Sequence, residues 1–419
     1  MALPAVTSAD TETPAAALPV CGGHAPGPAD NPSPPAAEIL AGYGTGGFAI
    51  RTKSPEAQAF FNNGMQLGHA FAHKAAISAF QQARRLDPDC AMCAWGEAWA
   101  RGPTINYTID KKAQAELAGI AGRAAALATD GPEKERQLTA ALQLRYRGGG
   151  GAGRGDHAFA KAMDAIAHAY PDDNELAILA ADAWMIPSSQ KNSRDNLDKA
   201  LALLGGALTR NPKDTGAIHF YIHATEMDGV PERALPFAER LQSLAPAASH
   251  LTHMPSHTYY WVGRYAAAVQ SNLDAVALDN ANAARLKAKG GVWGLSYHSH
   301  NVMFGEGAAL MDGDAASALA LARPALAHLQ TQDPSVADDQ LSAVTAYFAE
   351  GRYGDQAEVA ALPDPGAKLQ FARAFWRYAR AEAAARRGDL AALKAEAGRS
   401  ASIRPPTPRS ATGAVWSGA

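Results

Sequence analysis

The chain is poor in the residues on which several classes of protein depend. Cysteine occurs three times in 419 residues, which excludes a framework of disulfides as the main support of a chain of this length. Aromatic residues make up only 7% and charged residues 19% of the total. The 38 basic and 41 acidic residues leave a net charge of −3, which excludes a broad electrostatic surface for nucleic acid or acidic membranes.

Long hydrophobic runs are also missing. No stretch approaches the ~18 consecutive apolar residues of a transmembrane helix, so no membrane span is expected. The N-terminus has no basic segment followed by an apolar one, and the sequence as written therefore carries no signal peptide.

Alanine and helical periodicity dominate the rest of the chain. Residues 1–54 are rich in Pro, Ala and Gly and predict an extended arm, and residues 405–419, rich in Pro, Ser and Gly, predict a tail. Between them, residues 55–404 have helical periodicity and no convincing alternation of the kind found in strands. The prediction is an all-α fold.

An internal repeat specifies which all-α fold to expect. The first copy contains Phe60, Gly64, Ala76, Phe80, Ala83 and Pro88, at the spacings of the tetratricopeptide (TPR) pattern. Pro212 and Pro246 lie one 34-residue period apart. A turn glycine is followed five residues later by alanine at Gly229/Ala234, Gly263/Ala268 and Gly388/Ala393. The sequence thus predicts a TPR-like α-solenoid of helix–turn–helix repeats with a concave groove.

Histidine, with 13 copies, is the unusual count, and six of these residues follow the repeat. His219 and His223 are four residues apart, and His253 and His257 repeat that pair 34 residues later. Residues four apart share one face of a helix, and in TPR solenoids these positions face the groove. Pro255 requires the second helix to start late or kink. His298 and His300 fall in the following repeat, so six imidazoles are expected at one stretch of the groove.

Such a cluster has several possible uses. Neutral imidazoles bind copper, zinc, iron or nickel, and an imidazole can also act as a general acid or base or recognise an acidic peptide. Alternatively, each His is a core residue that makes hydrogen bonds within the solenoid. Several imidazoles crowded together without a metal would have lowered pKa values and would leave polar groups in need of hydrogen-bond partners, which favours metal binding. Copper is expected ahead of zinc and iron.

Other residues near the His positions extend the predicted site. Glu226 is a candidate metal ligand, a partner of a His ligand or a general base, and otherwise a solvated charge. His250 is interpreted as a residue at a helix start rather than as a further ligand. The candidates for substrate contact are Tyr221, Tyr260, Asn301, Trp95 and Trp99.

Cys90 and Cys93 follow Asp87-Pro88-Asp89 and therefore open a helix. A helix N-terminus lowers the pKa of a thiol, and Cys-x-x-Cys is a spacing found in redox and soft-metal sites. The alternatives are a structural disulfide and a pair of buried thiols.

Several of these motifs together resemble a widespread group of bacterial TPR proteins of uncertain role. The resemblance lies in the Cys-Ala-Met-Cys-x-Trp-Gly element from Cys90 to Gly96 and the His-Met-Pro-Ser-His element from His253 to His257. It covers most of residues 56–310 and implies the solenoid fold and the His site, but no reaction. Members of the group often look exported, so a periplasmic or exported location is favoured.

The leading functional hypothesis is a metal-dependent oxidoreductase that acts on a small molecule at the His cluster in the groove. A metal-dependent hydrolase with Glu226 as base is one alternative. The other is a non-catalytic TPR module whose groove binds a peptide or partner protein.

Overall fold

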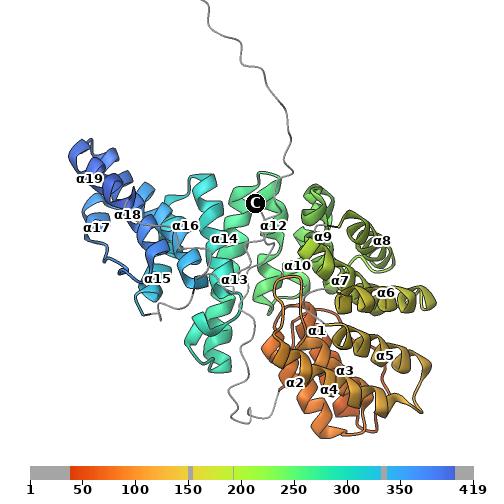
Figure 1. Cartoon of the computed structure of the whole chain (residues 1–419). Helices are drawn as coiled ribbons and strands as arrows, with labels where there is room; N and C mark the ends of the chain where they lie inside the picture. Colours follow the sequence, from red (N-terminus) through yellow and green to blue (C-terminus); the bar gives the residue numbers. More distant parts are fainter. Residues whose placement is uncertain (1–37, 150–153, 192, 332–336, 402–419) are drawn as a thin grey trace, which may run out of the picture.

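The computed structural model describes residues 38–149, 154–191, 193–331 and 337–401, and within them it contains helices and no strand (Figure 1). The N-terminal helices are α1 (Pro55–His69), α2 (His73–Leu86), α3 (Ala91–Ala100), α4 (Lys111–Ala128), α5 (Glu133–Arg147), α6 (Arg154–Ala169), α7 (Asn174–Lys191) and α8 (Arg194–Arg210). The central helices are α9 (Thr215–Asp228), α10 (Leu235–Leu244), α11 (Ser249–His253), α12 (Pro255–Trp261), α13 (Tyr265–Leu286) and α14 (His298–Asp312). The C-terminal helices are α15 (Ala315–Leu329), α16 (Ala337–Tyr353), α17 (Gln356–Ala361), α18 (Gln370–Arg386) and α19 (Leu390–Ala401).

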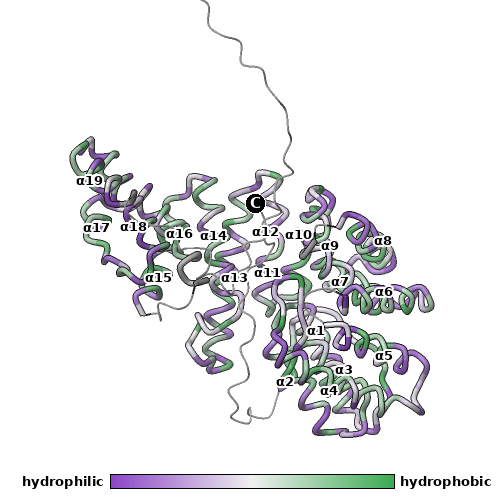
Figure 2. Tube along the Cα trace, in the orientation of Figure 1, coloured by the Kyte–Doolittle hydropathy of each residue, from purple (hydrophilic) through white to green (hydrophobic). Residues whose placement is uncertain are grey.

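Helices that follow one another in the chain pack side by side along most of this series, as α1 and α2, α6 and α7, and α13 and α14 do. Short connections make such neighbours antiparallel. The result is an array of helix pairs, the predicted TPR-like α-solenoid. In Figure 2 hydrophobic and hydrophilic residues alternate along the helices, as expected where one side of each helix is buried. The predicted tail, residues 405–419, and residues 1–37 of the predicted arm lie outside the described residues.

The turn glycines of the repeat end helices as predicted. Gly229, Gly263, Gly313 and Gly388 follow α9, α12, α14 and α18, with φ angles of 78°, 75°, 81° and 73°. This left-handed backbone is strained for other residues, which explains why glycine recurs at these positions. The alanines that follow two of them, Ala234 and Ala268, are fully buried against neighbouring helices.

Phe80 explains two further glycines of the first helices. One edge of its ring touches both Gly64 of α1 and Gly96 of α3: a Cβ atom would lie 2.7 Å from the ring if added to Gly64 and 2.3 Å from it if added to Gly96. Three helices can therefore meet closely around one aromatic side chain. This is the contact that the Gly64 and Phe80 positions of the repeat predict.

The described part of the predicted arm, residues 38–54, is here called the strap. It has no helix and runs along the solenoid, hydrogen-bonded to residues of several elements. Leu40 exchanges two hydrogen bonds with the Asn63 side chain, at 2.9 Å each. The Gly42 carbonyl accepts from the Ala247 amide at 3.0 Å, and the Gly47 amide donates to Glu175 at 2.9 Å. The strap is therefore hydrogen-bonded to α1, to α7 and to the segment that follows α10, and so connects distant parts of the N-terminal half of the array.

Buried hydrophobic side chains form two main clusters. One extends from the strap to α11, and the other extends from α13 to α18. The helices that carry the predicted His residues, α9, α11, α12 and α14, come from both sides of this division. None of the helices that the structure describes is long and apolar enough to cross a membrane.

Glu306 of α14 gives the fold a pH-dependent contribution. The carboxyl is fully buried and accepts a hydrogen bond from Thr345, and burial raises its pKa from 4.5 to about 8. Between these values the folded chain binds a proton that the unfolded chain does not, so the free energy of unfolding falls as pH rises, by at most about 1.4 kcal/mol per pH unit. We expect Glu306→Gln to remove this part of the slope. Urea unfolding at pH 5, 6.5 and 8 measures it, and equal slopes in both proteins would contradict the assignment.

Candidate metal centre

The first imidazole group consists of His219, His223 and His250. The first two lie one turn apart on α9, and the third lies on α11. Nε2 of His219 is 3.2 Å from Nε2 of His223 and 3.2 Å from Nε2 of His250. The three nitrogens thus converge on one point between the helices.

The second imidazole group consists of His253, His257 and His300. Met254 separates α11 from α12, so the predicted break before Pro255 is present and sets His253 and His257 on successive short helices. Nε2 of His253 is 3.0 Å from Nε2 of His257 and 2.9 Å from Nε2 of His300 on α14. Both groups therefore combine an i, i+4 pair with one His from another helix.

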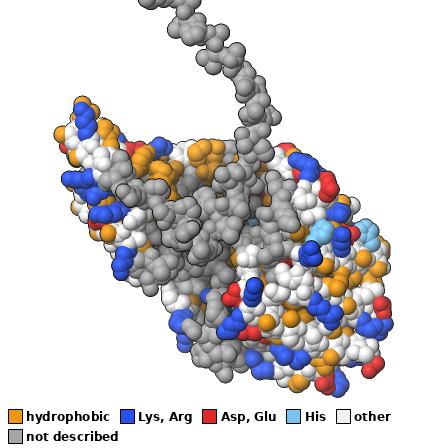
Figure 3. All heavy atoms as spheres, in the orientation of Figure 1, with side chains coloured by type: hydrophobic (Ala, Val, Ile, Leu, Met, Phe, Trp, Pro, Cys, Tyr) orange, Lys and Arg blue, Asp and Glu red, His pale blue; other side chains and the backbone are white. Residues whose placement is uncertain are grey.

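The two groups are neighbours. The ring centroids of His223 and His257 are 5.2 Å apart, and those of His250 and His253 are 5.5 Å apart. All six rings are buried. Figure 3, which shows one face of the molecule, has acidic, basic and hydrophobic side chains interspersed and few His side chains.

Burial keeps most of these imidazoles neutral. It lowers the pKa of His219 from 6.5 to about 3, and neighbouring imidazoles add to the effect. Burial also lowers the pKa values of His223, His250, His253 and His300 well below the usual value. The neutral ring is the form that coordinates a metal ion.

Hydrogen bonds fix the orientation of three of the rings through Nδ1. His219 Nδ1 lies 2.6 Å from the backbone carbonyl oxygen of His69, and His253 Nδ1 lies 2.6 Å from Oδ1 of Asn272. His257 Nδ1 lies 2.9 Å from Oε2 of Glu226. Each oxygen accepts the Nδ1 proton, which leaves a lone pair on Nε2 and is the usual arrangement around metal-binding His residues.

The spacing within each group fits a metal ion. Three imidazole nitrogens bound to one ion at about 2.0–2.1 Å lie roughly 2.9–3.4 Å from one another, depending on the coordination geometry. The separations from Nε2 of His219 and of His253 to their two neighbours, 2.9–3.2 Å, fall in this range, and all three ligand atoms of each group lie within 4.8 Å of one another. The residues present therefore fit one ion in each group.

A phenylalanine ring contacts all three imidazoles of each group. Phe71 lies 4.4, 6.1 and 5.1 Å, between ring centroids, from His219, His223 and His250. Phe304 lies 5.1, 4.4 and 4.5 Å from His253, His257 and His300. Phe71 has a φ angle of +54°, a strained value for a residue with a side chain. Strain of this kind is common at functional sites and persists only where the surrounding packing enforces it.

Glu226 lies beside both groups, at the end of α9. Its Oε2 accepts from His257 and is 4.0 Å from Nδ1 of His223, and its Oε1 accepts from the Trp261 indole at 2.8 Å. The carboxylate therefore approaches the imidazoles on the side away from the converging Nε2 atoms. Glu226, His223 and His257 form a third group whose atoms are close enough to hold an ion.

His298 is the predicted ligand that the structure places outside the two groups. Its Nδ1 lies 3.1 Å from Asp279 of α13, and its ring packs edge-on against Trp293. Asn301 donates to the same Asp279 carboxylate at 2.9 Å. Both residues thus tie α14 to α13 beside the second group.

The predicted substrate contacts lie in different surroundings. Tyr260 packs edge-on against Phe304, at 6.2 Å between ring centroids, whereas Tyr221 packs against Phe237 of α10. Trp95 and Trp99 stack on each other in the N-terminal core, and the Trp95 indole donates to the Leu138 carbonyl. Trp99 touches His69, whose backbone carbonyl holds His219.

Sequence reasoning missed His250, Phe71 and Phe304 as parts of the site. His250 lies three residues before His253, a spacing that places both on one side of a helix, and this signal was available in the sequence. Phe304 lies four residues after His300 on α14, a second signal available in the sequence, whereas Phe71 comes from the turn after α1 and no local pattern connects it to the imidazoles.

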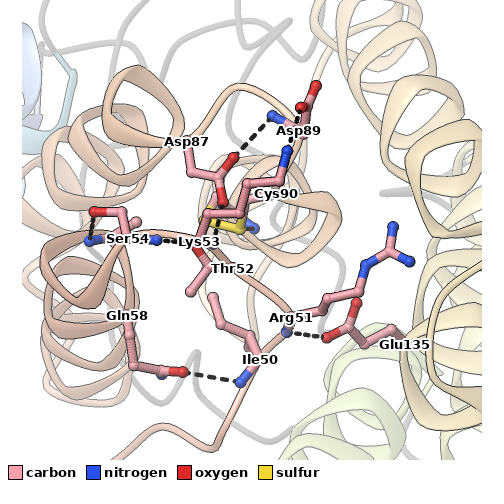
Figure 4. Close-up of a disulfide and its surroundings, with 12 residues drawn as sticks. Ile50, Arg51, Thr52, Lys53, Ser54, Gln58, Asp87, Asp89, Cys90 and Glu135 are labelled. Carbon is pink, nitrogen blue, oxygen red and sulfur yellow. Dashed lines mark hydrogen bonds and ion pairs between the residues drawn. A yellow bond between two sulfur atoms is a disulfide. The ribbon is translucent and has the colours of Figure 1, made fainter.

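Cys90 and Cys93 form a disulfide at the N-terminus of α3. Figure 4 shows it beside the strap, where Thr52 and Lys53 donate to the Asp87 carboxylate just before the helix, at 2.6 and 2.9 Å. Cys90 Sγ also accepts from the Cys93 amide at 3.0 Å and so caps the helix. Among the three predicted alternatives, the structure has the disulfide.

We expect replacement of both cysteines by serine to lower the free energy of unfolding by about 2 kcal/mol, because a disulfide that closes so short a loop constrains the unfolded chain little. The metal content should stay unchanged, since neither sulfur belongs to an imidazole group. Urea unfolding and elemental analysis of the double variant check both points, and wild-type protein under reducing conditions is the control. A loss of metal would contradict the separation of the two features.

Comparisons with known proteins do not assign the chain to a family. No family model matches it, and neither does any curated protein. One similar solved structure is Naa15/Naa10 bound to HypK-THB, with 12% identity, a TM-score of 0.26 and coverage of 85% of this chain and 59% of that one. The P58(IPK) TPR domain has 13% identity and a TM-score of 0.20, over 84% of this chain and 95% of that one. Yeast Tom70 has 12% identity and a TM-score of 0.20, over 84% of this chain and 86% of that one. The chain spans less than two thirds of the length of the first of these. At these TM-scores the similarities carry no argument about function.

Proposed function

We propose that the protein is a metal-dependent enzyme. In this proposal the two imidazole groups hold transition-metal ions, and the metal-loaded enzyme oxidises a small molecule. The observation that carries the proposal is the convergence of six buried Nε2 atoms in two adjacent groups of three. Three protein ligands leave a coordination position open, as in catalytic metal sites, whereas structural sites are closed by a fourth protein ligand.

Copper is the favoured metal because the donor set is made of nitrogen alone. Imidazoles suit copper, zinc and iron, and among divalent ions such a site binds copper most tightly. Magnesium, calcium and manganese prefer carboxylate oxygens, and the carboxylate beside these rings, Glu226, is engaged at Nδ1 of His257. Bound copper or iron would supply redox chemistry with dioxygen.

The chain's own residues have distinct roles in this proposal. Asn272, Glu226 and the His69 carbonyl orient the rings, and Phe71 and Phe304 exclude water from the two groups. Tyr260, which packs on the Phe304 ring that contacts the second group, is the residue that we retain for substrate contact. Tyr221, Asn301, Trp95 and Trp99 contact other parts of the structure and are assigned to packing around the site.

The hydrolase alternative is less well supported. It needs a zinc ion and a carboxylate free to take a proton from water. Both oxygens of Glu226 accept hydrogen bonds, one from His257 and one from Trp261. We therefore assign Glu226 to the positioning of His257 rather than to catalysis.

A second candidate function is a non-catalytic binding module with a structural metal. The strap favours it, because an extended segment of the chain already lies along the solenoid in the manner of a bound peptide. Its Thr45 amide donates to the Thr215 hydroxyl at 2.8 Å, and its Arg51 amide donates to Glu135 at 2.5 Å. An extended peptide from a partner protein could bind to other repeats through contacts of the same kind.

We further propose that the chain belongs with the bacterial TPR proteins that share its Cys-Ala-Met-Cys-x-Trp-Gly and His-Met-Pro-Ser-His elements, and that residues 55–404 form its solenoid unit. The disulfide between Cys90 and Cys93 supports an oxidising compartment such as the periplasm, because disulfides persist there and are rare in the cytosol.

Elemental analysis of protein purified without a histidine tag tests the proposed function. The expected result is copper at a stoichiometric ratio, with one or two ions per chain. Zinc at the same ratio with no open coordination position would favour the structural-metal module. Protein that contains no stoichiometric metal and binds none on addition of Cu²⁺ or Zn²⁺ would overturn the proposal.

A further inference from the structure

The first and second imidazole groups lie next to each other in the solenoid. We infer that they form one binuclear centre, in which the two ions share a single small ligand, dioxygen in the proposed reaction. This inference rests on the proposed function, since it concerns the ions that the same groups bind. It adds a relation between the ions, which act as a pair and not as two separate sites.

The boundary between the two groups is made of imidazole rings. His223 meets His257 edge-on, with ring centroids 5.2 Å apart, and His250 stacks on His253 at 5.5 Å. The ring of His250 also lies 6.4 Å from that of His300. Five of the six imidazoles therefore have a ring of the other group as a neighbour.

Glu226 spans this boundary on the side away from the converging Nε2 atoms. Its Oε2 accepts the Nδ1 proton of His257 at 2.9 Å and lies 4.0 Å from Nδ1 of His223. A carboxylate oxygen and one nitrogen of each of these two rings all lie within 4.8 Å of one another. One residue at the end of α9 thus lies against a ligand of the first group and a ligand of the second.

Each of the two phenylalanine rings contacts one group only. Among the described residues, Phe71 has imidazole contacts with all three rings of the first group, at 4.4–6.1 Å between centroids, and none with the second. Phe304 contacts all three rings of the second group, at 4.4–5.1 Å, and none of the first. The side of each group that faces the other is therefore lined by imidazoles, and the open coordination position of each ion belongs on this inner side.

The separation of the groups suits two ions that share a ligand. Metal–nitrogen bonds are about 2.0–2.1 Å long, so ring separations of 5.2 and 5.5 Å put the ions roughly 4–7 Å apart. The lower end of this range matches known two-metal sites, whose ions are about 3.5–4 Å apart. A ligand of two or three atoms, such as dioxygen or azide, bridges a wider gap than a single oxygen atom does. Because all six rings are buried, the shared ligand must be small.

A pair of ions gives the two groups a common purpose. One copper ion exchanges a single electron with dioxygen, whereas two copper ions that share the molecule exchange two. The overall reaction balances in atoms and electrons: the substrate gives up two electrons and two protons, and dioxygen takes them all to become hydrogen peroxide.

Electron paramagnetic resonance of full-length protein loaded with two equivalents of Cu²⁺ tests the inference, with azide as the probe of the shared position. Each Cu²⁺ ion has one unpaired electron, and two ions this close interact magnetically. We expect the neighbouring ion to broaden the resonance. Azide that bridges the ions should then remove most of the signal, while elemental analysis still finds two ions per chain.

His219→Ala and His253→Ala are the matched variants, because each leaves one group intact. Each should bind one ion with a full and unbroadened signal, which azide shifts but does not remove. His168→Ala is the control for the substitution itself, since His168 is exposed on α6 and outside both groups. It should behave as wild-type protein does.

Two bound ions with full, unbroadened signals that persist in azide would overturn the inference while the proposed metal centre stands, and so would a single ion per chain. Protein that binds no Cu²⁺ at all would instead overturn the proposed function. Because the wild-type measurement needs no variant, the inference stays testable even if a substitution prevents folding.

Discussion

His253→Ala is expected to lose the ion of the second imidazole group and the stability that this ion confers. His253 Nε2 is the shared neighbour of the other two nitrogens of its group, at 3.0 and 2.9 Å, so its removal leaves the group with two ligands. A ligand present at 1,000 times its dissociation constant stabilises a folded protein by about 4 kcal/mol. We expect wild-type protein to gain about this amount from the ion of the second group, and His253→Ala to lose this part of the gain.

Thermal or urea unfolding with and without added Cu²⁺, together with elemental analysis, measures this difference. His168→Ala is the control, because His168 is an exposed residue of α6 outside the imidazole groups and should leave the metal-dependent gain intact. If His253→Ala kept both its metal content and its metal-dependent stability, the second group could not be a metal site.

Gly64→Ala is expected to lower the free energy of unfolding by about 2–3 kcal/mol. The new methyl group would lie 2.7 Å from the ring of Phe80, and that ring has little room to move, because the same ring edge is also in tight contact with Gly96 of α3. Overpacking of a tight core typically costs about 1–3 kcal/mol, and the value here should lie at the upper end because two helices enclose the ring. Urea unfolding of the variant gives the value.

Gly122→Ala is the matched control for Gly64→Ala. Gly122 also lies within a helix, α4, and a Cβ atom there would meet nothing within 4 Å. Alanine at an open helical position should stabilise the protein by up to about 1 kcal/mol. The two substitutions are therefore expected to have opposite signs. Equal effects would mean that the close contact around Phe80 is not formed.

The fold could be predicted from the sequence because its repeat places small residues where helices touch. Gly64 and Phe80 lie at repeat positions that meet in the structure, and Gly229 and Gly263 end helices with the left-handed backbone that their spacing implies. Each of these contacts is between residues close in the chain, so a periodic pattern suffices to find it. The course of the strap could not be found in this way, because its partners lie up to about two hundred residues away.

The part of the candidate site that follows the repeat could be predicted from the sequence. The part at the start of α14, where His298 and His300 lie, could be predicted less well. The spacing of His219 and His223, repeated at His253 and His257, brings four imidazoles to neighbouring helices. His298 and His300 are two residues apart, which on a helix means nearly opposite directions, so only one of them can join the group. The structure directs His300 to His253 and His298 to Asp279, a choice set by how α13 packs on α14.

The partners of the imidazoles lie beyond the reach of spacing arguments. Asn272 comes from α13, and Phe71 comes from a turn about 150 residues before His219 and His223 in the chain. Their contact with the imidazoles depends on how the helix pairs stack, which a periodic pattern does not encode. Asn272 nevertheless determines which nitrogen of the His253 ring carries the lone pair.

The most direct test of the metal centre is an anomalous difference map from crystals of Cu²⁺-loaded protein, recorded at the copper absorption edge. The account predicts one peak among Nε2 of His253, His257 and His300 and one among Nε2 of His219, His223 and His250, each at about 2.0 Å from its nitrogens. A peak beside Glu226 on the Nδ1 side of His223 and His257, or no peak at any of the six imidazoles, would contradict it.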